Sequence, residues 1–280
     1  MQKLTDAQKQ QFHADGYLHL EQVFNAEEVA YYSSEIDRIR SIPGYEPDKN
    51  PDVPRGHYIW MDHTPDLDPE GFMDRRELLT YGDSFLGLVD KVPVFDYVLD
   101  LMGPNILFSM SQAIVRPPNE RFPGYTHTDG GESLRQIRPD AQSPPIALKA
   151  MFLLTDVTAE NSGNLTVFPG SHTKQIPYGD EGYMTPYSPG AKQLMGKAGD
   201  VYLFTHSLWH GPAKNLSGKS RKVILYNYCQ LWVRCYDYNQ IPDTSGFTPR
   251  QRRLLGDLGY DFCPGSYFYV PKDQAEVMMG

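Results

Sequence analysis

Three scarcities narrow the class of protein before any motif is considered. The chain of 280 residues has only three cysteines, an odd number without zinc-ligand spacing, which argues against a disulfide framework and favours a reducing compartment, the cytoplasm. No apolar run is long enough to cross a bilayer, and the opening residues lack the apolar segment of a secretory signal, so we expect no membrane partner. No block of lysine or arginine offsets the formal net charge of −9, so we do not expect nucleic acid as a partner.

The chain is well supplied with apolar side chains and with turn-forming residues. Hydrophobic residues make up 40% of the sequence and aromatic residues 12%, which is enough for one large core. The 23 prolines and 24 glycines indicate many turns and irregular loops. This composition is typical of a single β-rich domain.

The first hundred residues are predicted to be mainly helical. Thr5 and Asn25 are typical N-cap residues, and each precedes a helical pattern. Residues 17–23 alternate between apolar and polar side chains and are predicted to form a strand between the two helices. Residues 43–75 are rich in Pro, Asp and Gly and predict a long loop, while 76–103 predict helices with a break at a proline.

From residue 104 onward the pattern changes from helical to extended. Short apolar or alternating runs, bounded by Gly, Pro, Asn and Asp, predict strands within 105–118, 146–157, 164–170, 200–206 and 221–233. Helices followed by many strands indicate a mainly β fold, a sandwich or barrel supported by N-terminal helices.

Two motifs carry the strongest chemical signal. GYTHTDGG places His127 and Asp129 two residues apart, and FTHSLWHGP contains His210. A His-x-Asp pair with a distant His is the ligand set of the facial triad of non-haem Fe(II), which leaves positions open for a substrate and O2. In an extended strand the side chains of His127 and Asp129 would both face the interior. His206 competes as the distal ligand, because four residues before His210 it would face the same way.

Two basic residues are candidates for anion binding. Arg221 lies eleven residues past His210 at the start of an apolar run, where it could hold a cosubstrate carboxylate in a fork of hydrogen bonds. The alternative is a solvated basic residue, which is what we expect of its neighbours Lys219 and Lys222. Lys149 lies inside the apolar run ALKAMFLL and either faces solvent or meets an anion in the interior.

Four blocks in order resemble the phytanoyl-CoA dioxygenase family of Fe(II)- and 2-oxoglutarate-dependent oxygenases. They are the opening 4–37, QAIVRPP (112–118) with the HTD that follows, LLTDVTAENSGNLTVFPGSH (153–172), which is the most specific, and 199–228. The resemblance implies a double-stranded β-helix, a jelly roll of the cupin type, with the metal inside one mouth. We expect one dioxygenase domain over 1–280: helical support and a substrate-side loop in 1–103, the β-helix core in 104–235, and a C-terminal extension in 236–280.

The resemblance assigns roles to the candidate ligands. It implies that His127, Asp129 and His210 hold Fe(II), and its spacing to Arg221 favours His210 over His206, which would then lie behind the ligands or pack nearby.

The resemblance also implies a cosubstrate site. Arg221 would bind the distal carboxylate of 2-oxoglutarate. Gln112 falls where family members place a residue beside the cosubstrate. Thr128, between the two metal ligands, and Lys149 are further cosubstrate candidates.

The implied reaction oxidises an unactivated C–H bond of a small-molecule metabolite with O2 and 2-oxoglutarate and releases succinate and CO2. Relatives that halogenate replace the carboxylate ligand with a small residue. Asp129 therefore favours hydroxylation, or a related desaturation or ring closure, over halogenation.

Two segments could face the substrate. The segment 116–149 could meet an anionic substrate or be a solvated loop with interleaved acids; its basic residues are Arg116, Arg121, Arg135, Arg138 and Lys149. The loop 173–198 could form a lid or pack onto the barrel; its tyrosines include Tyr178, Tyr183 and Tyr187.

Two other classes of protein compete with an oxygenase. A non-redox hydrolase could use two His and one carboxylate to hold Zn²⁺, but it gives Arg221 no role and needs a general base. A ligand-binding β-barrel would not need an intact triad.

Overall fold

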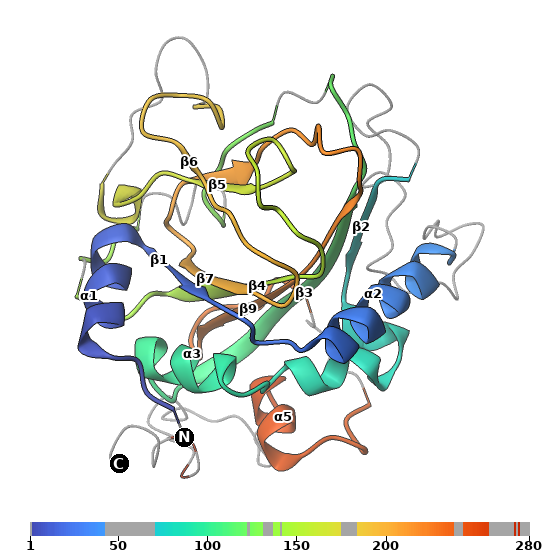
Figure 1. Cartoon of the computed structure of the whole chain (residues 1–280). Helices are drawn as coiled ribbons and strands as arrows, with labels where there is room; N and C mark the ends of the chain where they lie inside the picture. Colours follow the sequence, from blue (N-terminus) through green and yellow to red (C-terminus); the bar gives the residue numbers. More distant parts are fainter. Residues whose placement is uncertain are drawn as a thin grey trace.

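Three layers make up the part of the chain that the computed structural model describes (Figure 1). Helices lie under a six-stranded antiparallel sheet, and a three-stranded sheet lies over it. The described residues are 2–42, 71–121, 124–130, 137–140, 142–174, 184–237, 243–257, 272 and 274. The prediction of a mainly β fold with N-terminal helices is confirmed.

The first two helices begin where the sequence predicts. Thr5 caps α1 (Asp6–Asp15) and Asn25 caps α2 (Ala26–Arg40), each in a capping box with the residue three positions later. The cap satisfies backbone N–H groups that a helix start would otherwise leave unpaired. One face of α2 is buried against the core through Tyr32, Ile36 and Ile39.

Short helical segments follow where 76–103 predicted helices. The turns η2 (Leu78–Tyr81) and η3 (Asp83–Leu88) have 3₁₀ geometry, and α3 (Val94–Met102) begins directly after Pro93. The predicted break at a proline is therefore confirmed.

All five predicted β segments after residue 104 contain strands. The large sheet has the order β1 (Tyr17–Leu20), β7 (Val201–Thr205), β4 (Ala147–Leu153), β9 (Arg221–Gln230), β3 (Ile106–Arg116), β2 (Met73–Arg76). The small sheet has the order β6 (Lys192–Gln193), β5 (Leu165–Val167), β8 (His210–Pro212). A 3₁₀ turn, η4 (Ser171–Thr173), and a C-terminal helix, α5 (Pro249–Leu254), complete the described elements.

Strand β2 corrects part of the predicted loop 43–75; residues 43–70 lie outside the described part of the chain. The run Met-Asp-Arg-Arg shows no apolar alternation, so periodicity could not reveal it. It is an edge strand paired antiparallel with β3, and Asp74 and Arg76 line a cavity. Pairing with β3, rather than local propensity, makes this segment extended.

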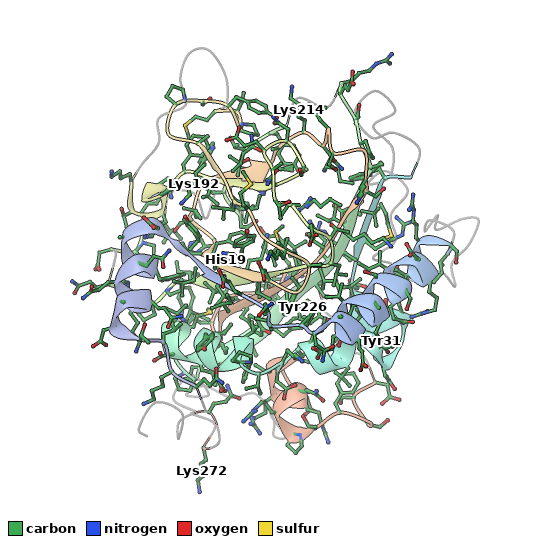
Figure 2. All side chains as sticks on the ribbon, viewed as in Figure 1. His19, Tyr31, Lys192, Lys214, Tyr226 and Lys272 are labelled. Atoms are coloured by element: carbon green, nitrogen blue, oxygen red, sulfur yellow. The ribbon has the colours of Figure 1, made fainter. Side chains whose placement is uncertain are left out.

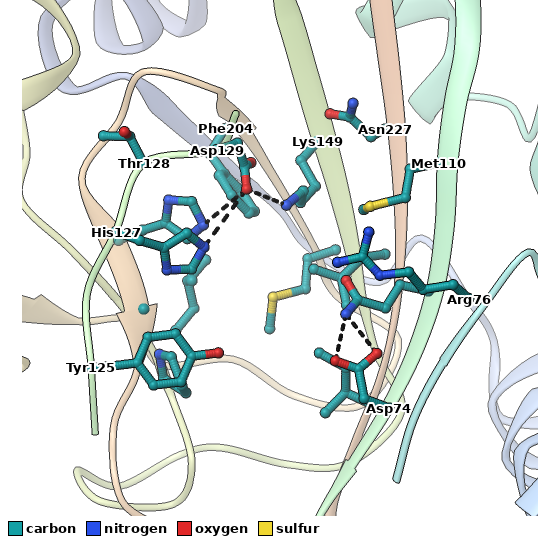
Figure 3. Close-up of a pocket in the computed structure, with 18 of the residues that line it drawn as sticks. Asp74, Arg76, Met110, Tyr125, His127, Thr128, Asp129, Lys149, Phe204 and Asn227 are labelled. Carbon is teal, nitrogen blue, oxygen red and sulfur yellow. Dashed lines mark hydrogen bonds and ion pairs between the residues drawn. The ribbon is translucent and has the colours of Figure 1, made fainter. Parts of the chain in front are cut away.

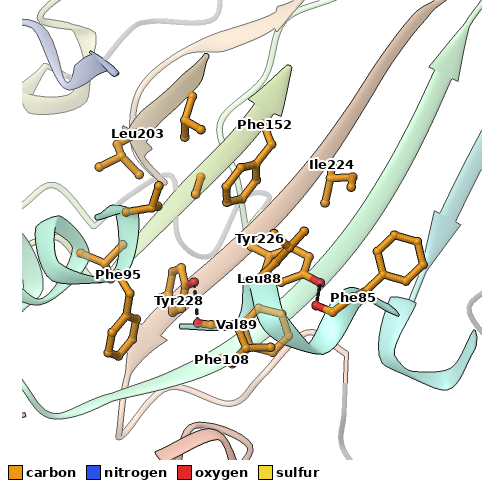
Figure 4. Packing of buried hydrophobic residues seen from close by; sticks show 14 of the residues in the cluster. Phe85, Leu88, Val89, Phe95, Phe108, Phe152, Leu203, Ile224, Tyr226 and Tyr228 are labelled. Atoms are coloured by element: carbon orange, nitrogen blue, oxygen red, sulfur yellow. Dashed lines mark hydrogen bonds between the residues drawn. The ribbon is translucent and has the colours of Figure 1, made fainter. Parts of the chain in front are cut away.

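Apolar packing occurs on both faces of the large sheet, and Figure 2 shows the side chains that fill the layers. On the outer face, aromatic residues of β3, β4 and β9 pack against η3 and α3 (Figure 4). A second, smaller cluster lies on the inner face and includes Val223 and Leu225 of β9. Among the described residues, no helix has the length and apolarity needed to cross a bilayer.

Candidate metal and cosubstrate site

Backbone pairing brings the two sequence motifs together. The N–H of His127 donates to the carbonyl of His210 at 2.7 Å, and the N–H of His210 donates back at 2.8 Å. The N–H of Asp129 donates to the carbonyl of His206 at 3.0 Å. The prediction that residues 127–129 form a regular strand is wrong: they form one β-bridge followed by a turn. The side chains still converge, because both ends of the segment are tied to residues 206–210.

Gly211 makes this close approach possible. A Cβ at this position would lie 1.8 Å from the carbonyl oxygen of Tyr125. No heavier side chain fits without displacing that backbone, so the glycine after His210 is a requirement of the site.

The three predicted ligands form one cluster (Figure 3). One ligand atom from each of His127, Asp129 and His210 lies within 4.8 Å of the others. Asp129 Oδ1 is 3.7 Å from His127 Nε2 and 3.9 Å from His210 Nε2. Two imidazole nitrogens and a carboxylate oxygen at these separations could hold a single metal ion.

His210 is prepared as a ligand, whereas His206 is not part of the cluster. The Nδ1 of His210 lies 2.8 Å from the carbonyl of Leu208, which directs Nε2 at the cluster. Burial, followed by the charge of His127, lowers the pKa of His210 to about 3, so the imidazole is neutral at physiological pH. Strand β7 ends at Thr205, and a turn separates it from β8. His206 and His210 therefore do not lie on one strand, in contrast to the prediction.

Lys149 meets an anion in the interior, one of its two predicted alternatives. Its Nζ donates to Asp129 Oδ1 at 2.7 Å, and its side chain is only 8% exposed. Burial alone would raise the pKa of Asp129, but the charge of Lys149 outweighs it and holds the pKa well below its usual range. Among the described residues, Asp129 Oδ2 has no hydrogen-bond partner.

A cavity of about 420 Å³ extends from the triad to Arg221. Arg221 is buried, and within the described part of the chain its Nε has no hydrogen-bond partner. Burial, followed by the charge of Arg116 directly opposite on β3, lowers the pKa of Arg221 to about 9. The guanidinium therefore stays charged at neutral pH and is suited to bind an anion.

Lys222 shows the contrast with its neighbour on β9. Its Nζ lies 2.6 Å from Asp37 Oδ2 on α2, away from the cavity. The prediction that Lys222 is merely solvated is therefore wrong in detail: it ties β9 to a helix. Lys219 is exposed, as predicted.

Gln112 and Thr128 both line the cavity. The Gln112 Nε2 donates to both carboxylate oxygens of Asp74, at 2.7 and 2.8 Å. Thr128 Oγ1 is buried without a hydrogen-bond partner among the described residues.

Of the two segments that could face the substrate, 116–149 and 173–198, only the first has described residues that line the cavity. Of the basic residues, only Arg116 and Lys149 line the cavity, while Arg121 is exposed and Arg138 donates to the backbone carbonyls of the turns at 171 and 207. The hydroxyl of Tyr187 lies 3.1 Å from Asn161 Oδ1, which ties the described end of that loop to the turn at 161. Tyr178, Tyr183 and Arg135 lie outside the described residues.

Sequence reasoning missed several polar residues of the cavity wall: Asp74, Arg76, Tyr125, Asn227 and Tyr236. The alternation along β9 could have revealed Asn227, since positions 221, 223, 225 and 227 share one face. Asp74 and Arg76 gave no signal, because their strand was not recognised.

A β-fold cavity with two histidines and a carboxylate at one side and a buried arginine at another has the ligand set that is typical of non-haem metal oxygenases. The chain belongs to the phytanoyl-CoA dioxygenase (PhyH) family, whose pattern matches residues 12–223.

Curated relatives are distant. An ectoine dioxygenase of Bordetella bronchiseptica is 26% identical over 286 residues, covering 90% of this chain and 82% of that protein. An uncharacterized protein of Mycobacterium tuberculosis is 24% identical over 160 residues, covering 57% of this chain. The match spans only 56% of that mycobacterial relative's length.

Solved structures share the fold. HygX from Streptomyces hygroscopicus, with nickel and 2-oxoglutarate bound, has a TM-score of 0.63 and 19% identity, covering 83% of this chain and 90% of that chain. The non-heme alpha ketoglutarate dependent epimerase SnoN has a TM-score of 0.59 and 18% identity, covering 80% and 82%. The jelly-roll fold implied by the resemblance is thereby confirmed.

Proposed function

We propose that this protein is a 2-oxoglutarate-dependent non-haem iron dioxygenase that oxidises a C–H bond of a small-molecule metabolite. Hydroxylation is the simplest outcome, and desaturation or ring closure would use the same site. The observation that carries the proposal is the convergence of His127, Asp129 and His210 on one cavity that also contains the buried Arg221. Membership of the PhyH family supports it.

The donor set suits Fe(II). His210 is held neutral and Asp129 ionised, so both present the protonation state that metal binding requires. Asp129 Oδ2, which lacks a hydrogen-bond partner among the described residues, is the kind of buried polar atom that a bound group would satisfy. The carboxylate ligand also disfavours halogenation, which in relatives needs that position vacated.

The cosubstrate fits the same cavity. Arg221 would bind the distal carboxylate of 2-oxoglutarate in a charge-assisted pair, and Thr128, Gln112 and Lys149, which line the same cavity, would hold its remaining oxygens. The apolar residues between them, Met151 and Leu225, would exclude water from the chain of the cosubstrate.

When bound, Fe(II) with 2-oxoglutarate and O2 supplies the oxidising power, with release of succinate and CO2. The protein's share is to position the substrate and to keep the site dry. Lys149 would orient the carboxylate of Asp129, and the carbonyl of Leu208 would orient the ring of His210.

The competing classes explain less of the site. A zinc hydrolase would need a general base beside the metal, and the nearest other carboxylate of the cavity wall, Asp74, is engaged by Gln112. A binding protein would not need His127, Asp129 and His210 to converge. In this proposal residues 1–280 form one dioxygenase domain, and the free thiols of Cys229 and Cys235 favour a cytoplasmic location.

Two measurements test the proposal. Anaerobic addition of Fe(II) and 2-oxoglutarate should give a weak visible charge-transfer band, and admission of O2 with ascorbate should give succinate. Metal-replete protein that shows neither would contradict the proposal. Turnover supported by Zn²⁺ without succinate would instead favour the hydrolase.

A further inference from the structure

We propose that the substrate is a small carboxylic acid whose carboxylate binds Arg76 and whose own N–H or O–H group binds Asn227. The inference rests on the proposed function, because both residues line the cavity of the triad. Neither residue was suggested by any motif of the sequence.

Arg76 reaches into the cavity from the edge strand β2, on the wall opposite the triad (Figure 3). Its nearest acid among the described residues is Asp237, with 3.9 Å between Nη1 and Oδ1, which is too long for a hydrogen bond. Its Nε is buried and has no hydrogen-bond partner in the described part of the chain. The guanidinium therefore keeps a fork of donors for a planar group with two oxygens, which is the geometry of a carboxylate.

Asn227 projects from β9 into the same cavity (Figure 3). The residue is only 4% exposed, and among the described residues its Oδ1 has no hydrogen-bond partner. Buried acceptors of this kind are few in folded proteins, so this one marks a place where a ligand N–H or O–H would be bound. Met110 lies between Asn227 and Arg76, so the part of the substrate that joins its two polar groups would be apolar.

The charge of the cavity wall favours an anion. Among the described residues that line it, four side chains are basic and two are acidic: Arg76, Arg116, Lys149 and Arg221 against Asp74 and Asp129. The two charges of Fe(II) would be matched by the two carboxylates of 2-oxoglutarate. The surplus of basic side chains therefore persists in the loaded enzyme and would attract a further anion.

The size of the cavity and the fork of Arg76 narrow the class of anion. About 420 Å³ must accommodate 2-oxoglutarate as well, so the substrate is of metabolite size. One guanidinium with an acid nearby suits a singly charged carboxylate. A phosphate dianion would need additional donors.

Matched probe pairs test the inference. Proline, N-acetylglycinate and lactate are each compared with their primary amides, which keep the shape and replace the negative carboxylate with a neutral group. Binding to protein loaded with Ni(II) and 2-oxoglutarate is measured by ligand-observed NMR. We expect the acids to bind at least about tenfold more tightly than the amides. Wild-type protein that binds no acid better than its amide overturns the carboxylate assignment.

Two arginines of closely similar setting provide the variant and its control. Arg76→Gln should abolish the preference for acids. Arg250→Gln is the control and should leave the preference for acids unchanged. The side chain of Arg250 is 31% exposed and that of Arg76 is 30% exposed, and each lies 3.9 Å from an acid, Asp90 and Asp237 respectively. A preserved preference in Arg76→Gln would overturn the assignment.

A second pair of variants tests the fork and the amide. Arg76→Lys keeps the charge but loses the fork, so it should reduce the preference for acids over amides only partly. An undiminished preference would overturn the role of the fork. Asn227→Leu should weaken binding of the acids about tenfold while the ratio of acid to amide stays constant. Loss of that ratio would overturn the division of roles.

Failure of the inference can be told from failure of the proposed function. The charge-transfer band with Fe(II) and 2-oxoglutarate requires neither Arg76 nor Asn227. A normal band without acid preference overturns only the substrate class. A missing band in wild-type protein overturns the dioxygenase itself.

Discussion

Alternate residues of β9 face opposite sides of the large sheet and meet opposite environments. On the outer side, the hydroxyl of Tyr226 donates to the carbonyl of Phe85 at 2.5 Å, and that of Tyr228 donates to Val89 at 2.9 Å (Figure 4). On the inner side, Asn227 and Arg221 carry polar atoms that have no partner among the described residues. The same strand thus contributes hydrogen-bonded side chains to the core on one side and polar atoms without such partners to the cavity on the other.

The contrast separates structural from functional polar groups. A buried hydroxyl that reaches a carbonyl is satisfied by the fold and needs nothing more. Buried donors and acceptors without protein partners cost stability, of order 1–3 kcal/mol each, unless ordered water or a ligand satisfies them, so several in one cavity indicate a binding site. In the cavity these residues include Arg76, His127, Thr128, Asp129, Arg221 and Asn227.

Asp129→Ala should have the largest effect, because it removes one of three protein ligands from the inner side. We expect loss of detectable turnover and weaker retention of iron. Iron content and succinate formation measure both quantities. His210→Ala should behave in the same way, whereas His206→Ala should be milder. Wild-type turnover in Asp129→Ala would mean that the carboxylate ligand lies elsewhere.

Lys149→Met tests whether the buried ion pair between Lys149 and Asp129 stabilises the protein in the absence of metal. It leaves the carboxylate of Asp129 buried without its cation, which should cost about 3–5 kcal/mol of unfolding free energy. Added Ni(II) should restore more stability to the variant than to the wild type, as thermal unfolding will show. Lys9→Met is the control, since its pair with Asp100 has nearly the same length, 2.8 Å, but Lys9 is 36% exposed. Equal losses of unfolding free energy in both variants would mean that burial of the Lys149–Asp129 pair does not increase its contribution to stability.

Arg221→Ala should raise the apparent KM for 2-oxoglutarate much more than that for iron. Removing one partner of a buried charge-assisted pair costs on the order of 2–5 kcal/mol, or roughly thirty- to several-thousand-fold in affinity. Arg221→Lys should restore only part of this, because it loses the fork. Lys222→Ala breaks only the contact with Asp37 and should change KM little. Equal effects at 221 and 222 would move the cosubstrate clamp to Arg116 or Lys149.

Tyr228→Phe should have the smallest effect and only on stability. It removes the donor to the Val89 carbonyl, at a cost of about 1–2 kcal/mol, with no change in KM for 2-oxoglutarate. Denaturant unfolding and steady-state kinetics measure the two quantities. A change in KM would show that the outer face is coupled to the cavity.

Local patterns in the sequence were sufficient for the helix starts and the five β segments, and they supplied the candidate ligands of the triad. Thr5 and Asn25 predict their helices because capping is a contact within four residues. His127, Asp129, His210 and Arg221 stand in motifs whose chemistry is carried by residue type and spacing.

Only the tertiary structure decided which side chains join the triad in one cavity. Strand β2 carries no periodic signal, and its pairing with β3 places Asp74 and Arg76 on the cavity wall. The choice between solvent and interior for Lys149, and between His206 and His210 for the cluster, depended on a turn and on backbone pairing between segments about eighty residues apart. Burial and long-range contact are properties of the assembled fold, and a local pattern cannot express them.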